Sequence, residues 1–166
     1  MIHWLSRAVA SAALVIGTLP LAAQQPAAEP APSTIGAVQA KLFFTDGTFS
    51  EDMLQVPHLG LWNTPIGEGW AKKPADATLV MVEVRGARGS IDAHRGVELT
   101  ATEQAAPRRV SLRRRANVCD IGDNGTCFVG FWLYDTGCVP IVLRARLVGQ
   151  SDSAVTQKVI PFRCGE

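Results

Sequence analysis

The sequence predicts an all-β protein, a single antiparallel sandwich of about seven strands. Apolar and polar residues alternate with a period of two in several segments, as in strands that turn one face to a core. Turn-forming residues recur roughly every ten positions in the second half of the chain. No segment has the 3.6-residue periodicity of an amphipathic helix.

The clearest expected strand covers residues 78–85, where Val80, Val82 and Val84 share one parity. The same pattern predicts six further strands, at residues 35–45, 97–102, 108–115, 128–134, 139–148 and 154–163.

The last two strands should form a hairpin. The odd positions of residues 139–148 are apolar, and Arg144 and Arg146 lie on the other parity. Residues 149–153 supply the turn. This register sets Arg144 opposite Lys158, an unfavourable like-charge pair that a slip of one or two residues would relieve.

The four cysteines predict two disulfides. Cys138 and Cys164 lie equally far from Ser151, so they face each other across the expected hairpin. Cys119 and Cys127 are likewise symmetric about Asp123, and Asn124-Gly125 reads as a tight turn inside a second hairpin. We therefore expect Cys119–Cys127 and Cys138–Cys164, one of three possible connectivities. The spacing does not fit a four-cysteine zinc site.

The N-terminus has the layout of a secretory signal peptide: Arg7, an apolar run over residues 8–19, and small residues before Gln24. We expect cleavage after Ala23, with an uncleaved membrane anchor as the alternative. The predicted organisation is a signal peptide at 1–23, a Pro/Ala-rich disordered linker at 24–34 and a β-sandwich domain at 35–166. The protein should then be periplasmic or secreted, with no transmembrane span after cleavage.

The exported part is nominally neutral, but its charges are unevenly placed. Residues 24–84 hold three basic and seven acidic side chains, whereas residues 85–166 hold twelve basic and eight acidic ones. Such a division can steer a charged partner.

Two stretches are candidate binding surfaces. The irregular segment 51–77 serves either as a loop that caps the core or as a recognition surface, with Trp62, Asn63, Glu68 and Trp70 as the binding residues. The basic run 108–115 offers Arg109, Arg113 and Arg115 to an anionic envelope component, or protects an edge strand from pairing. Nucleic acid is not an expected partner, because the protein is exported and the run lacks neighbouring aromatics.

No catalytic residue, metal ligand or cofactor is predicted. His58 and His94 are too few imidazoles for a dismutase-type copper–zinc site. No nucleophile-elbow pattern occurs. Residues 120–125 faintly resemble a calcium loop, but the third position is not acidic and Phe131 stands where the bidentate Glu would be.

Two resemblances follow from short motifs. Tyr134–Cys138 resembles the Asp-x-Gly corner of immunoglobulin-like domains, although Cys138 stands where the corner tyrosine would be. This similarity implies an immunoglobulin-like sandwich. The segments Trp62–Gly69, Asp135–Cys138 and Cys164–Glu166 resemble a family of small, uncharacterised secreted bacterial proteins, and this similarity implies no activity.

The sequence thus predicts a secreted or periplasmic module, a non-catalytic binding or structural protein of the cell envelope whose partner is a protein or an anionic component. The alternative is a small periplasmic enzyme or metal carrier that uses His58 and His94.

Overall fold

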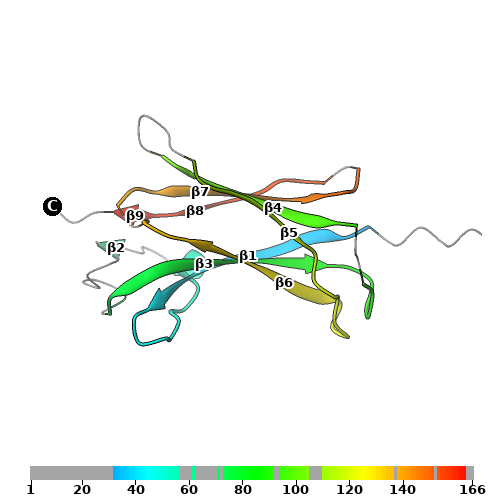
Figure 1. Cartoon of the computed structure of the whole chain (residues 1–166), viewed down its shortest axis with the longest axis horizontal. Coiled ribbons are helices and arrows are strands. Elements are labelled where there is room, and N and C mark those ends of the chain that lie inside the picture. The colour runs from blue at the N-terminus through cyan, green and yellow to red at the C-terminus, as the bar shows by residue number, and fades with distance from the viewer. Residues whose placement is uncertain are drawn as a thin grey trace, which may run out of the picture.

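A computed structural model describes residues 32–56, 61–62, 71, 73–91, 94–104, 110–136, 138–151 and 153–163. Of residues 61, 62, 110 and 111 it describes the main chain alone. Two antiparallel sheets pack face to face, as Figure 1 shows. The predicted β-sandwich is therefore confirmed.

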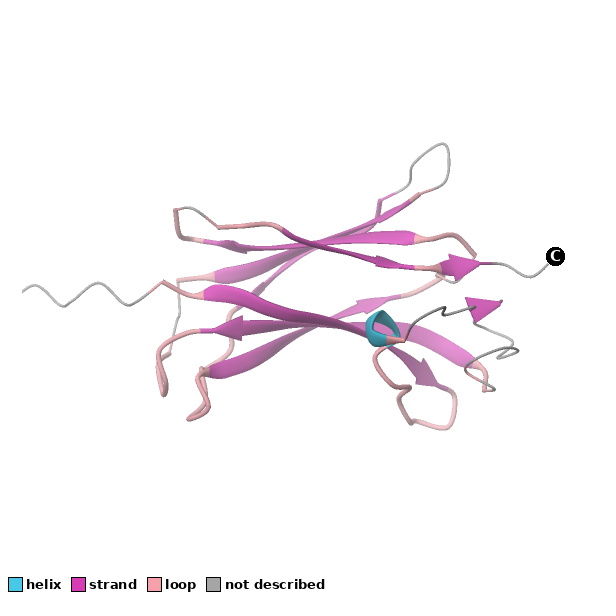
Figure 2. Cartoon of the chain, turned by 180° about the vertical axis from the view of Figure 1, so that it is seen from behind, coloured by secondary structure: helices cyan, strands magenta, loops and turns pink. Residues whose placement is uncertain are grey.

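The first sheet has three strands in the order β1-β3-β6. They are β1 (Thr34–Phe44), β3 (Ala75–Arg85) and β6 (Thr126–Leu133). The second sheet has four strands in the order β5-β4-β7-β8. They are β4 (Gly96–Glu103), β5 (Val110–Asn117), β7 (Ile141–Val148) and β8 (Thr156–Ile160). A short strand β2 (Leu61–Trp62) pairs in parallel with β9 (Phe162–Arg163), and the 3₁₀ helix η1 (Met53–Gln55) lies beside β1 (Figure 2).

The core lies between the two sheets and is built from the parity that the sequence predicted. Val80, Val82 and Val84 of β3 are fully buried. They face the alternate apolar residues of β4 and β7, among which Leu99 and Leu143 are also buried. Non-directional burial of these side chains is the main force that holds the sheets together.

The strand order is that of an immunoglobulin-like sandwich with one departure. In the constant-type arrangement the fourth strand belongs to the sheet of the first strand. Here the fourth long strand, β5, pairs with β4 in the other sheet. Asp135 has a φ of 53° and lies between β6 and β7, which is the place of the corner that the Asp-x-Gly resemblance predicted.

The domain begins earlier than predicted. β1 starts at Thr34, and Ser33 is buried and accepts a hydrogen bond from Arg95 Nη1 at 2.9 Å. The domain thus includes Ser33 and Thr34, which the prediction assigned to the linker. The signal peptide and residues 24–31 lie outside the described residues.

Part of the irregular segment 51–77 is ordered structure. β3 begins at Ala75, and the Met53 side chain of η1 is buried in the core. Asp52 caps this helix, since its carboxylate accepts a hydrogen bond from Leu54 N. Residues 51–56 therefore cap the core edge. The side chains of Trp62 and Trp70, on which the two readings of the segment differ, lie outside the described residues.

The register of the β7–β8 hairpin differs from the prediction by one residue. Arg144 lies opposite Gln157, and not opposite Lys158. Its Nε donates a 3.0 Å hydrogen bond to Gln157 Oε1, so a favourable contact replaces a like-charge pair. The symmetry argument fails because the centre of the turn lies between Gln150 and Ser151, half a residue from the assumed position.

The Cys119–Cys127 disulfide is confirmed, with a Cα–Cα distance of 5.9 Å. It does not close a hairpin, because β5 and β6 belong to different sheets. The bond therefore ties the crossover between the sheets. Asn124 still lies in a local turn, where its Oδ1 accepts from Thr126 N at 3.1 Å. Cys138 is disulfide-bonded too, and its predicted partner Cys164 lies outside the described residues.

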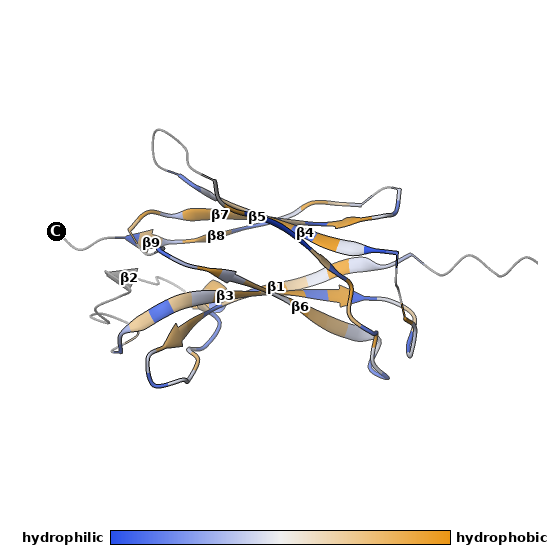
Figure 3. Cartoon of the chain, in the orientation of Figure 1, coloured by the Kyte–Doolittle hydropathy of each residue, from blue (hydrophilic) through white to orange (hydrophobic). Residues whose placement is uncertain are grey.

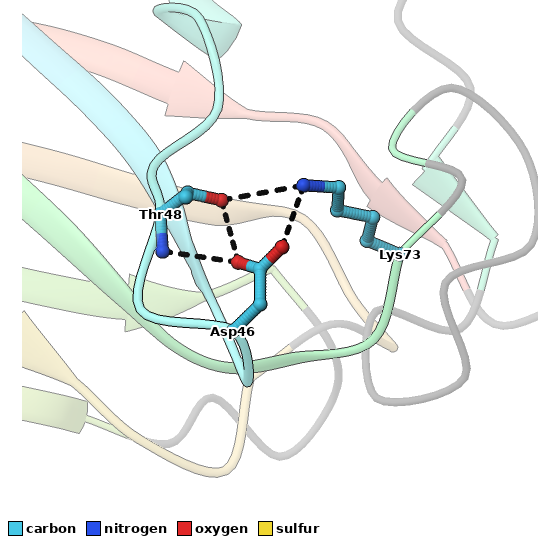
Figure 4. A network of polar contacts seen from close by, with 3 residues as sticks. All are labelled: Asp46, Thr48 and Lys73. Atoms are coloured by element: carbon cyan, nitrogen blue, oxygen red, sulfur yellow. Dashed lines mark hydrogen bonds and ion pairs between the residues drawn. The ribbon is translucent and has the colours of Figure 1, made fainter.

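A small polar network fixes the turn after β1 (Figure 4). Asp46 accepts hydrogen bonds from the main-chain N–H and the hydroxyl of Thr48, at 3.0 and 2.6 Å. Lys73 Nζ lies 2.6 Å from Asp46 Oδ2 and joins the turn to the segment that leads into β3. The hydrogen bonds from Lys73 and then from Thr48 lower the pKa of Asp46 to about 2.

Candidate functional site

Four arginines gather on the outer face of the four-stranded sheet. Arg113 of β5 and Arg144 of β7 both lie opposite Thr100 of β4. One pair further along, Arg115 and Arg146 both lie opposite Glu98. Two parallel rows result, each with an arginine at either end and a β4 residue between. We call these six residues the arginine face; Figure 3 shows the hydrophilic centre of β5 that contributes to it.

Sheet geometry sets the spacing of the arginine face. Residues two apart on one strand are separated by about 6.8 Å, and β5 and β7 lie two strand spacings, roughly 9.6 Å, apart. All four arginines are exposed to solvent. Their guanidinium groups can thus reach a ligand that lies flat across the sheet.

One carboxylate opposes the four guanidinium groups of these rows. Glu98 is partly buried and accepts a 2.8 Å hydrogen bond from Arg146 Nε. Arg144 is oriented by Gln157, as described above. No hydrogen bond or ion pair joins Arg113 or Arg115 to another residue of the described chain. The donors of Arg113 and Arg115 are therefore available to a ligand.

Gly96 makes room for one of these free side chains. A Cβ built at position 96 would lie 2.7 Å from Arg115 Nε and 2.9 Å from the carbonyl oxygen of Ala116. Arg115 therefore extends across the start of β4, where any side chain would displace it. A shallow depression beside Arg144, lined in part by Thr102, Val142 and Gln157, continues this surface toward β8.

Guanidinium groups are always charged, and their planar forks match the oxygens of carboxylate, phosphate and sulfate groups. The arrangement can therefore bind several anionic groups at once.

Two of the predicted binding residues, Arg113 and Arg115, belong to this face. The sequence did not indicate that Arg144 and Arg146 join them. The apolar–polar alternation placed Arg144 and Arg146 on the exposed side of their strand. Only the pairing of β4 with both β5 and β7 makes the four arginines neighbours. Arg114 lies opposite Leu99 on the inner parity, yet it is exposed because β5 is an edge strand.

The other predicted binding residues lie outside this face or outside the described residues. The main chain of Trp62 is in β2, opposite Arg163. Asn63, Glu68, Trp70 and Arg109 lie outside the described residues.

Of the two histidines in the alternative prediction of an enzyme or metal carrier, the structure describes one. His94 is exposed just before β4, and His58 lies outside the described residues. Within the described ranges, no cluster of three or more His, Cys, Asp or Glu side chains could hold a metal ion.

Comparisons of the chain with protein-family models, curated proteins and solved structures found no match. The resemblance to small secreted bacterial proteins thus stays a prediction. None of the helices in the described part is long and apolar enough to cross a membrane. The Cys119–Cys127 disulfide is compatible with an oxidising compartment.

Proposed function

We propose that the protein is a non-catalytic binding module of the cell envelope, secreted or periplasmic, whose arginine face binds an anionic polymer. The observation that carries this proposal is the pair of cross-strand rows that place four guanidinium groups around one carboxylate. These rows bear a net charge of +3.

A local surface, and not the charge of the whole molecule, supplies the attraction. The exported part has 15 basic and 15 acidic side chains once Arg7 of the predicted signal peptide is removed from the 16 basic ones. A nominally neutral protein has no net charge with which to attract a polyanion. The arginine face therefore has to bind a polyanion through direct contacts.

The shape of the surface favours a polymer over a small molecule. Small ligands are held in concave, mostly apolar pockets, whereas these arginines stand on an open sheet face. A chain of phosphate- or sulfate-bearing units can contact both rows at once, and its repeated charges compensate for weak single contacts.

The test measures binding of the purified protein to dextran sulfate and to inorganic polyphosphate, with neutral dextran as the blank. The variant Arg113→Gln/Arg144→Gln removes both charges from the row that contains Thr100. It should bind about tenfold more weakly, because each exposed guanidinium–anion contact contributes up to about 1 kcal/mol. The dependence of affinity on salt concentration should also become shallower.

The matched control is Arg88→Gln/Arg163→Gln, which removes the same charge from two exposed arginines outside the arginine face. It should change the affinity less than twofold. Equal losses in the two double variants would show that binding follows net charge, and the proposal would be wrong. So would the absence of binding to either polyanion by the wild-type protein.

A further inference from the structure

The outer face of the three-stranded sheet carries a group of aromatic side chains, in contrast to the arginine face. Phe43, Phe49 and Trp132 form an aromatic cluster, with ring centroids 5.2 to 6.2 Å apart. Phe128 of β6 and Tyr134, which directly follows β6, are 48% and 63% exposed. Exposed apolar surface of this kind commonly marks an interface.

The two edges of this sheet differ. The main-chain donors of β1 are capped by the segment that follows it: Ala40 N–H donates to Asp52 Oδ1 and Leu42 N–H to Ser50 Oγ, both at 2.9 Å. β6 forms the opposite edge, and in the described part of the chain no strand other than β3 pairs with it.

The open edge of β6 presents a defined set of main-chain groups. Gly86 N donates to Gly125 O, which fixes the phase of the β3–β6 ladder. Because hydrogen-bonded and non-hydrogen-bonded pairs alternate, the pairs of β3 with Phe128, Gly130 and Trp132 are non-hydrogen-bonded. The N–H and C=O groups of these three residues therefore point away from β3.

β6 also lacks the features that keep other edge strands from pairing. Its sequence TCFVGFWL has no charged residue and no proline. The edge strands of the second sheet do carry charges, since β5 has three consecutive arginines and β8 contains Lys158. An uncharged, regular edge strand is a template for another strand.

We infer that β6 pairs with β6 of a second copy of this chain and forms a two-fold symmetric dimer. The open groups permit an antiparallel register in which Gly130 meets Gly130 of the second copy on the axis. Phe128 then faces Trp132 of the second copy, and this contact occurs twice. The sequence Phe-x-Gly-x-Trp is thus complementary to itself, as a two-fold interface requires.

The charges nearest to this junction do not oppose the pairing. Glu83 lies opposite Phe128 on β3, but its carboxylate accepts hydrogen bonds from Arg85 Nε at 2.9 Å and from Ala37 N at 2.7 Å. It is directed along the sheet toward β1 and is already neutralised. Each copy covers roughly 300 Å² of exposed aromatic surface in addition to the strand edge, which places the dimer in the weak, concentration-dependent class.

The experiment is sedimentation velocity on the full exported protein from about 1 µM to about 1 mM, in about 0.3 M salt, where repulsion between the β5 arginines of the two copies is screened. A reversible dimer should appear with a dissociation constant of micromolar order. Phe128→Lys places a charge at the junction and should raise that constant at least tenfold. Its matched control is Val155→Lys, which adds the same charge at an apolar side chain that is 57% exposed just before β8, beside the other sheet. That control should leave the constant within twofold.

A second variant tests the register. A Cβ at position 130 would lie 3.4 Å from Leu79 Cδ1, an ordinary contact with a flexible side chain, so Gly130→Cys should fold. Hydrogen-bonded antiparallel partners have Cα atoms about 5.5 Å apart, within the range of a disulfide, so mild oxidation should cross-link this variant into a covalent dimer. Phe49→Cys should not cross-link.

Three outcomes would overturn the inference. A protein that stays monomeric at about 1 mM has no such interface. A dimer whose dissociation constant Phe128→Lys leaves unchanged would associate through another surface. Open-ended oligomers would contradict a closed two-fold arrangement.

Discussion

Replacing Asp52 with alanine should destabilise the domain, because a single carboxylate oxygen holds two main-chain donors. Oδ1 accepts from Leu54 N at 3.1 Å and from Ala40 N at 2.9 Å. Loss of the first bond removes a helix cap and costs about 1 kcal/mol. Loss of the second leaves a donor of β1 without an acceptor and costs about 1–2 kcal/mol. We expect Asp52→Ala to lower the free energy of unfolding by about 2–3 kcal/mol.

Asp52→Asn is the matched control, since it retains an oxygen at the same position and should cost less than about 1 kcal/mol. Urea unfolding followed by tryptophan fluorescence measures both values. The midpoint for Asp52→Ala should fall by about 1 M or more, with an unchanged slope. A loss below about 0.5 kcal/mol for the alanine variant would refute the idea that this oxygen stabilises the edge of β1. Equal losses for both variants would show that the charge matters and the acceptor does not.

Two further perturbations test the loops. Cys119→Ser/Cys127→Ser should lower the free energy of unfolding by about 2–3 kcal/mol, the chain-entropy value for a loop of this length. Calorimetry measures this loss, and an unchanged stability would contradict a role for the disulfide in tying the sheets together. Lys73→Ala should raise the pKa of Asp46 from about 2 toward its ordinary value of 3.8, as followed by NMR titration of the carboxyl carbon. Because the folded-state pKa lies below the unfolded value, the stabilisation by Asp46 is present above pH 3.8 and is lost as the pH falls toward 2. The variant should lose part of this acid dependence, and an Asp46 pKa that stays near 2 would assign the shift to Thr48 alone.

The sequence predicted the strands well because each strand has a periodic pattern of its own. Val80, Val82 and Val84 are sufficient to indicate a buried face, whichever strands lie beside them. The hairpin register failed because cysteine symmetry constrains the turn centre only to within a residue. The buried position of Met53 was missed because one apolar residue in an irregular segment has no period to identify it.

The candidate site could be predicted only in part. Arg113 and Arg115 stood out as a charge run along the sequence, whereas Arg144 and Arg146 had no such signal, being two alternating arginines in a strand. Their common surface arises from long-range pairing with β4, and the periodic pattern of a single sequence does not reveal which strands pair. The same limit hid the open edge of β6, since the exposed parity of a strand says nothing about its neighbours.

The position of β5 has a consequence for both surfaces. In constant-type sandwiches the fourth strand belongs to the first sheet, which here would mean that β5 pairs with β6. In that arrangement β6 would lie inside a four-stranded sheet, and both of its edges would be hydrogen-bonded. Arg113 and Arg115 would leave Glu98 and Thr100, and β4 would have arginines on one side only. The pairing of β5 with β4 therefore both creates the arginine face and leaves the edge of β6 open for dimerisation. A sandwich in which β5 paired with β6 would lack both surfaces, even if all of these side chains were unchanged.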